Sequence, residues 1–149
     1  MPQEHILFVE DTPGISLINS VFLREYGYRV TEASCAADAL DQINRREPLT
    51  ALVTDINLGL GQDGFDVARH ARAVYPHLPV IFISALNKER HRFEGVRGSE
   101  FIAKPFYPRQ IVDALIRTLY QEQTNPIFAD PRLTGAGEPS KGQDPRLSA

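Results

Sequence analysis

The sequence predicts a doubly wound α/β domain, in which helices cover both faces of a parallel sheet. Two observations lead to this prediction. Short apolar runs without alternation occur at residues 6–9, 52–53 and 80–83, as is typical of strands buried on both faces. A segment with helical spacing of apolar residues follows each strand after a short link, so the strand–helix unit occurs five times. This order indicates a fold class but not a function.

Each element is bounded by residues that start or stop regular structure. Pro13 begins the first helix and Gly27 ends it, while Pro48 closes the second helix. Asp63 is placed to cap the third helix, which Pro76 stops. The predicted strands cover residues 5–9, 28–32, 51–54, 80–83 and 100–102, and the predicted helices cover 13–26, 36–46, 64–75, 87–96 and 108–122.

Size and composition indicate one domain over residues 1–122 and a disordered tail over 123–149. The chain has 149 residues, and its last part is rich in Pro and Gly and poor in bulky apolar residues. The tail repeats Asp-Pro-Arg-Leu at 130–133 and 144–147, which is either coincidence or a paired docking motif.

The charge and the apolar content exclude several classes of protein. A net charge of -3 provides no general basic field for nucleic acid. The sequence contains no apolar stretch long enough to span a membrane and no signal peptide at its start. We therefore expect a cytoplasmic protein that binds neither nucleic acid nor membrane.

Charged residues stand where the buried strands end. Glu10 and Asp11 follow the first strand, Asp55 follows the third, and Lys104 follows the fifth. The carboxyl ends of parallel strands share one edge of the sheet, so these side chains are expected to meet there. Two carboxylates about 4 Å apart repel by roughly 4 kcal/mol at an effective dielectric constant near 20, which a divalent cation would relieve. Oxygen ligands favour Mg²⁺, and the main-chain carbonyl of Asn57 could join them.

An aspartate beside a metal can also be a nucleophile toward phosphorus. Lys104 would supply positive charge to the phosphoryl oxygens, and the Ser84 hydroxyl at the end of the fourth strand could donate a hydrogen bond to them. Taken singly, each residue has a simpler interpretation, such as a solvated turn, a helix cap or a surface lysine. Their joint occurrence at four strand ends favours a phosphoryl-accepting site.

The combination of Glu10-Asp11, Asp55, Ser84, Phe101 and Lys104-Pro105 resembles the receiver domain of bacterial two-component response regulators, of the stand-alone type. The resemblance covers residues 4–122 and implies a flavodoxin-like (βα)5 fold with a five-stranded parallel sheet. It implies that a histidine kinase or a histidine phosphotransfer protein phosphorylates Asp55, in a two-component system or phosphorelay.

The resemblance also implies roles for the other residues. Mg²⁺ would be held by Asp11, Asp55 and the Asn57 carbonyl, with Glu10 acting through a metal-bound water. Lys104 would pair with the acceptor carboxylate or the phosphoryl, and the Lys104-Pro105 bond would be cis. Ser84 would move toward the phosphoryl group. The aromatic switch position is occupied by Phe101, for which plain core packing is the alternative.

The loop after Asp55 departs from the usual receiver pattern. It is Gly-rich, lacks Pro and is one residue longer than usual over residues 57–64. No motif of an effector domain follows the receiver, so we expect signalling through contacts with an unknown downstream protein or with a second copy in a homodimer. We expect no enzymatic output beyond phosphoryl acceptance and autodephosphorylation. A receiver-like adaptor that acts without phosphorylation is the alternative. A phosphatase of the aspartyl-phosphate type is disfavoured, because Asp55-Ile56-Asn57 lacks a second acid.

Overall fold

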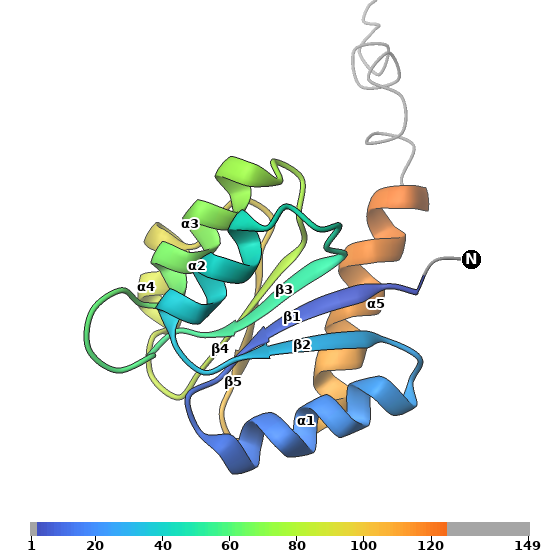
Figure 1. The fold of residues 1–149 in the computed structure, drawn as a ribbon, viewed down its shortest axis with the longest axis horizontal. Helices are drawn as coiled ribbons and strands as arrows, with labels where there is room; N and C mark the ends of the chain where they lie inside the picture. Colours follow the sequence, from blue (N-terminus) through green and yellow to red (C-terminus); the bar gives the residue numbers. More distant parts are fainter. Residues whose placement is uncertain (1–2, 125–149) are drawn as a thin grey trace, which may run out of the picture. The chain divides into compact units, whose positions relative to one another are not determined.

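The computed structural model describes residues 3–124 and contains five strands alternating with five helices (Figure 1). The strands are β1 His5–Val9, β2 Arg29–Ala33, β3 Ala51–Asp55, β4 Val80–Ser84 and β5 Glu100–Ala103; the helices are α1 Pro13–Glu25, α2 Ala36–Asn44, α3 Gly64–Val74, α4 Lys88–Glu94 and α5 Pro108–Thr124. The predicted tail over 123–149 lies, except for the end of α5, outside the described residues.

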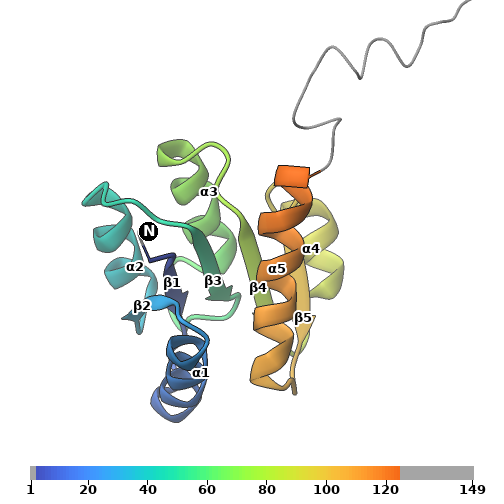
Figure 2. The same cartoon turned by 90° about the vertical axis from the view of Figure 1, so that its right-hand side faces the viewer.

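All five strands are parallel and stand in the order β2-β1-β3-β4-β5. This order confirms the predicted doubly wound, flavodoxin-like fold. The chain divides into compact units over residues 1–115 and 116–149, and the second half of α5 belongs to the latter. Within the first unit, α2, α3 and α4 cover one face of the sheet, and α1 lies on the opposite face (Figure 2).

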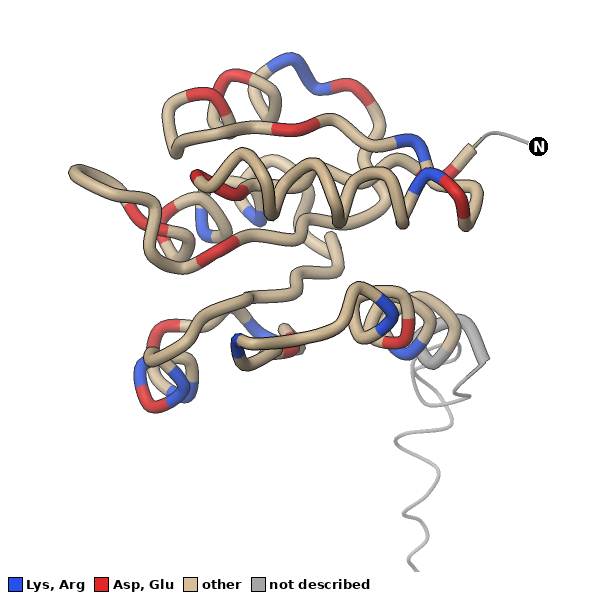
Figure 3. Tube along the Cα trace, turned by 90° about the horizontal axis from the view of Figure 1, so that it is seen from below, with Lys and Arg blue, Asp and Glu red and all other residues tan. Residues whose placement is uncertain are grey.

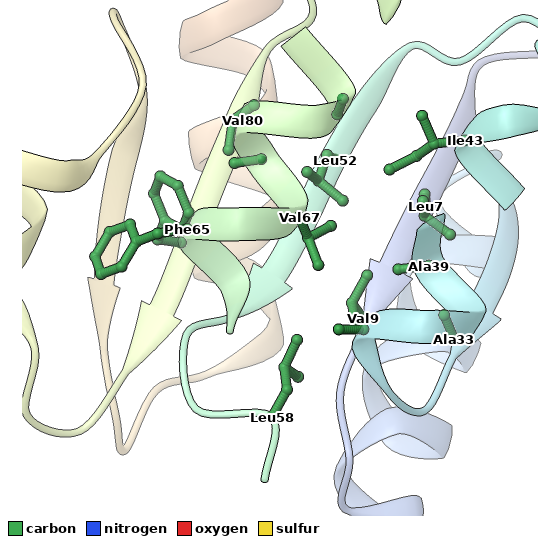
Figure 4. Packing of buried hydrophobic residues seen from close by; sticks show 14 of the residues in the cluster. Leu7, Val9, Ala33, Ala39, Ile43, Leu52, Leu58, Phe65, Val67 and Val80 are labelled. Carbon is green, nitrogen blue, oxygen red and sulfur yellow. The ribbon is translucent and has the colours of Figure 1, made fainter. Parts of the chain in front are cut away.

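The core on the α2 and α3 side consists of strand and helix side chains that are almost fully buried (Figure 4). Leu7, Val9 and Leu52 project from the strands toward Ile43 of α2 and Val67 of α3. Successive strand residues point to opposite faces, and every residue of β1, β3 and β4 is buried. Burial on both faces explains the non-alternating apolar runs of the sequence.

Helix α1 buries a face that its sequence pattern does not indicate. Its buried residues are Ser16, Asn19, Ser20 and Leu23, whereas the side chain of Ile18 is 62% exposed. The Ser16 hydroxyl donates to the Glu32 carboxylate at 2.7 Å, which satisfies one of these buried polar groups. Among the apolar residues of α1, Ile18 and Val21 therefore lie at the surface, while Leu23 is buried.

Within residues 3–124, none of the helices combines the length and the apolar character that crossing a bilayer requires.

Candidate functional site

The parallel register brings four strand ends to one edge of the sheet. Asp55 is the last residue of β3 and Ser84 is the last residue of β4, while Glu10 follows β1 and Lys104 follows β5 directly. Backbone hydrogen bonds continue past the strands: Glu10 N donates to Ala33 O at 3.0 Å, and Lys104 N donates to Ser84 O at 3.0 Å. These bonds fix where the side chains leave the sheet, so the predicted convergence of the strand ends is observed.

Three carboxylates form the centre of this edge. Glu10, Asp11 and Asp55 each place an oxygen within 4.8 Å of the oxygens of the other two. The side chains of Glu10 and Asp55 are buried, and that of Asp11 is exposed. A cluster of this kind with one side open to solvent can bind a cation that keeps part of its hydration shell.

Lys104 contacts two of the three carboxylates. Its Nζ donates to Asp55 Oδ2 at 3.1 Å and lies 3.5 Å from Glu10 Oε1. The following Lys104-Pro105 peptide bond is cis, as the resemblance implies. Among the residues described at this edge, Lys104 is the only positive side chain beside the three acids, so negative charge is in excess.

Burial and mutual repulsion change the pKa values of these groups. Desolvation, followed by the charge of Asp55, raises the pKa of Glu10 to about 7, although Lys104 acts in the opposite direction. The pKa of Asp55 is also raised, chiefly by desolvation, and Lys104 reduces this shift. Desolvation alone would lower the pKa of Lys104, but the hydrogen bond and charge of Asp55 and the charge of Glu10 outweigh it and raise that pKa. Without a cation, Glu10 therefore holds a proton on part of the molecules near neutral pH, and burial makes the charged form of Asp55 less favourable.

One atom of the cluster tests whether a cation fits here. Glu10 Oε1 is buried and accepts no hydrogen bond within residues 3–124, although Lys104 Nζ is 3.5 Å away. A buried carboxylate oxygen without a hydrogen bond is costly, and a metal-bound water could donate to it. Glu10, Asp11 and Asp55 thus form an oxygen donor set suited to Mg²⁺.

The loop after Asp55 turns back sharply onto β3. Gly64 N donates to Ile56 O at 2.8 Å, and a Cβ at position 64 would approach Ile56 Cα to 2.9 Å and overlap the Asp55 carbonyl. Only glycine fits this close approach without displacing the strand end. Asp63 then caps α3 as predicted, and it forms a reciprocal capping box with Asp66.

The Ser84 hydroxyl is buried and is contacted by the turn that leads into α4. Leu86 N, Asn87 N and Asn87 Nδ2 lie 3.3, 3.4 and 3.2 Å from Ser84 Oγ, each as a donor. Asn87 Nδ2 also donates to Asn57 Oδ1 at 3.1 Å. The predicted site serine is therefore held within the β4–α4 turn, and the Asn57 side chain is tied to the same turn.

Phe101 is half buried and packs against the ring of His91 from α4, with the ring centroids 5.5 Å apart. The ring of His91 in turn makes an edge contact with Phe82 of β4, with the centroids 5.5 Å apart, so the three rings form a cluster between α4 and the sheet. Phe101 also packs against the main core cluster. The described position matches core packing, and a switch role for Phe101 stays a prediction.

Sequence reasoning did not identify two residues that connect the site to its surroundings. Arg90 of α4 donates to Asp63 at 3.1 Å and lies over the ring of Phe65 at 5.0 Å, while Asn87 bridges Asn57 and Ser84. For Asn87, the sequence offered one signal, namely an Asn three residues after the Ser at the strand end. The same pattern is equally typical of a helix N-cap. For Arg90, the sequence offered no signal.

An apolar groove of about 430 Å³ lies beside Lys104. It is formed by α1 and by the loop between β5 and α5, and its lining residues include Ile15, Ile18, Ala85, Pro105 and Phe106. Ile15 and Ile18 of α1 therefore line the same groove as Lys104, which contacts the carboxylate cluster.

Comparison with known proteins adds a family to this geometry. The chain matches the response regulator receiver domain over residues 6–116. It is 31% identical over 121 residues to the transcriptional regulatory protein CreB of Escherichia coli, and this match covers 80% of the chain and 52% of CreB. It is 30% identical over 122 residues to the transcriptional regulatory protein CssR of Bacillus subtilis, covering 78% of the chain and 53% of CssR. The chain thus spans about half the length of these curated relatives.

Solved structures agree with this match. A response regulator receiver protein from Sinorhizobium medicae is 30% identical with a TM-score of 0.76, covering 79% of this chain and 95% of that one. The receiver domain of a sensor histidine kinase from Pseudomonas aeruginosa is 27% identical with a TM-score of 0.69, covering 80% and 99%; it was crystallised with a magnesium ion coordinated in its active site cleft.

Proposed function

This chain belongs to the response regulator receiver family, and we propose that it accepts a phosphoryl group on Asp55 from a histidine kinase or a histidine phosphotransfer protein. The observation that carries the proposal is the contact of Lys104 Nζ with Asp55 Oδ2 at 3.1 Å inside a cluster of three carboxylates. A lysine beside an acid can serve as a simple ion pair. Three acids gathered around one lysine at strand ends are better suited to binding a cation and a phosphoryl group.

Each residue of the cluster has a separate role in the proposed phosphoryl transfer. An Asp55 carboxylate oxygen attacks the phosphorus as the bond from phosphorus to the donor nitrogen breaks, and the donor imidazole keeps that electron pair. Asp11, Asp55 and the Asn57 carbonyl would hold Mg²⁺, with Glu10 acting through a metal-bound water, and the ion would supply positive charge to the phosphoryl oxygens. Lys104 supplies a second positive charge from the end of β5.

The phosphoryl group would then be read out by nearby side chains. Ser84 would leave the β4–α4 turn to donate a hydrogen bond to a phosphoryl oxygen. The space that its hydroxyl vacates, together with the movement of the turn, would allow Phe101 and His91 to repack between α4 and β5. The resulting change in the α4 and β5 surface is the proposed signal to a downstream protein.

The apolar groove is the proposed contact for the phosphodonor. In-line attack requires the donor histidine to reach Asp55, and the groove is lined by Lys104, whose Nζ contacts Asp55 Oδ2 at 3.1 Å. Exposed Ile18 on α1 can bury apolar area against the donor. Residues of both charges alternate along the described trace (Figure 3), so we propose the apolar groove, and not a region of one charge, as the contact for the donor.

We assign the receiver to residues 1–122, as the sequence predicts, and the proposed output is a protein contact rather than a reaction. The adaptor hypothesis differs in one respect, because it requires no phosphoryl on Asp55. Glu10 Oε1 is buried and accepts no hydrogen bond within residues 3–124, which favours the phosphoacceptor function, since an adaptor gains nothing from that desolvation cost.

Acetyl phosphate with Mg²⁺ tests the proposal directly. Intact mass should rise by one phosphoryl group in the wild type, and the increase should be absent from Asp55→Asn and from wild type with chelator. A folded wild type that gains no mass at saturating donor and Mg²⁺ would support the adaptor instead. Label that persists in Asp55→Asn would place the acceptor at another residue.

A second variant separates acceptance from readout. Lys104→Ala should still fold, because the lysine side chain lies at the edge of the site and not in the core. Backbone amide chemical shifts of α4 should change on phosphorylation in wild type and much less in Lys104→Ala. Equal changes in both proteins would remove Lys104 from the readout.

A further inference from the structure

The contacts of Asn87 show an arrangement that goes beyond phosphoryl acceptance. Its side-chain amide donates to Ser84 Oγ at 3.2 Å and to Asn57 Oδ1 at 3.1 Å, so a single NH₂ group joins the ends of two neighbouring loops. Asn57 lies two residues after Asp55, and Ser84 is the residue proposed to move when a phosphoryl group is bound. Asn87 thus connects a loop of the acceptor site to the moving hydroxyl.

The amide of Asn87 is used in an unusual way for its position. Asn87 is the N-cap residue of α4, where an Asn side chain normally accepts a hydrogen bond from the first turn of its own helix. No such cap bond is present in the described structure. The side chain is instead directed at Ser84 and Asn57, which indicates that its bonds serve the site and not the helix.

Ser84 Oγ in turn accepts from three N–H groups, all supplied by Leu86 and Asn87. A hydroxyl that rotates toward a phosphoryl group must give up these donors. The bonds therefore stabilise the unphosphorylated position of Ser84. Because a conformational equilibrium responds to any interaction made in one state only, each bond reduces the fraction of molecules that is ready to bind the phosphoryl.

We propose that Asn87 is a positioning residue that restrains Ser84 in the unphosphorylated conformation, through a latch made of the Asn57, Asn87 and Ser84 side chains. This inference rests on the proposed function. The latch sets how readily a phosphoryl group at Asp55 recruits the Ser84 hydroxyl. Asn57 contributes by accepting the second hydrogen bond of the same NH₂ group, so the two asparagines act as one unit.

Binding of beryllium trifluoride with Mg²⁺, a non-covalent mimic of the phosphoryl group, tests the latch. Asn87→Ala should bind the mimic about two- to tenfold more tightly than wild type, the range expected when one or two net hydrogen bonds of the resting state are lost. Asn57→Ala should act in the same direction. The double variant should show less than the product of the two effects, because the residues share one amide.

Asn44→Ala is the matched control. Asn44 Oδ1 accepts from His70 Nε2 at 2.7 Å and so joins α2 to α3 away from the carboxylate cluster. This variant also loses one side-chain hydrogen bond between two elements, but its affinity for the mimic should equal that of wild type. Unchanged or weaker binding in Asn87→Ala would overturn the latch, and weaker binding would show that the amide contacts the phosphoryl itself.

Amide hydrogen exchange tests the latch without any phosphoryl mimic. The Leu86 N–H donates to Ser84 Oγ, so its exchange should be several-fold faster in Asn87→Ala than in wild type or Asn44→Ala. Equal exchange in all three proteins would overturn the latch. Failure of the wild type to bind the mimic would contradict the proposed phosphoacceptor function. The latch would then be tested by hydrogen exchange alone, which does not depend on that function.

Discussion

Helices α3 and α4 follow neighbouring strands but are held in very different ways. Five of the eleven residues of α3 are buried, and its N-terminus carries a reciprocal capping box. Helix α4 has seven residues, none of which is buried. The side chain of its N-cap residue, Asn87, makes no hydrogen bond to the first turn of the described helix. Short helices gain most of their stability from packing, so α4 is the element that can shift at low cost. A fixed α3 holds the loop after Asp55 in place, while a loosely held α4 can respond to the phosphoryl group.

The largest difference is expected from an aromatic residue in each helix. Phe65 of α3 is fully buried and lies 5.0 Å from the ring of Phe82, whereas Phe93 of α4 is 83% exposed. Phe65→Ala should lower the free energy of unfolding by about 3–5 kcal/mol because it leaves a cavity in the core. Phe93→Ala should change it by less than about 0.5 kcal/mol. Urea unfolding of both variants measures the difference, and equal losses would contradict the contrast between the helices.

The next largest effect is expected at the start of α3. Gly64→Ala should destabilise the protein by about 1–3 kcal/mol, because the new methyl group would overlap the backbone at the end of β3. The displacement should also slow phosphorylation of the adjacent Asp55. Gly14→Ala is the control, since a Cβ there meets no atom within 4 Å among the described residues. Thermal unfolding and acetyl phosphate labelling should show a loss in the first variant only.

A smaller effect is expected at the two N-caps. Asp63→Ala removes the capping box of α3 and should cost about 0.5–2 kcal/mol. Asn87→Ala removes no described cap bond and should cost less, even though it changes the affinity for a phosphoryl mimic. Chemical denaturation compares the two losses of stability. A greater loss in Asn87→Ala would show that α4 contributes more to the fold than its exposure indicates.

The smallest effect is a pH dependence that originates in α4. Burial lowers the pKa of His91, whose ring contacts Phe82 and Phe101 and whose Nε2 lies 2.9 Å from the uncharged Ser99 hydroxyl. The unfolded chain therefore binds this proton more readily than the folded one, so stability falls as pH decreases through 6.5 and below.

His91→Gln removes this titration and serves as the comparison. The stability of wild type relative to His91→Gln should decrease between pH 7 and pH 5, measured by urea unfolding at several pH values. His70→Gln is the control, because His70 lies on α3 and its pair with Asn44 does not include the rings of Phe82, His91 and Phe101. A difference between wild type and His91→Gln that stays constant over this pH range would contradict the prediction.

The sequence determined the fold and most of the candidate site. Strands that are buried on both faces of a parallel sheet require continuous apolar runs. The strands predicted from these runs, 5–9, 51–54 and 80–83, end within one residue of β1, β3 and β4. Because parallel strands end at a common edge, the strand-end positions of Glu10, Asp55 and Lys104 predicted their meeting.

Only the tertiary structure decided which face each helix buries and how the turns are connected. Ile15, Ile18 and Leu23 recur at helical spacing in α1, yet Leu23 is buried and Ile18 lies outward, while the polar Ser16 is buried. Periodicity defines a stripe of apolar residues without specifying the neighbour that covers it. The bridge from Asn57 through Asn87 to Ser84 joins residues that are 30 and 3 positions apart. Such a contact depends on how two loops approach each other across the sheet edge, and no local pattern in the sequence encodes that distance.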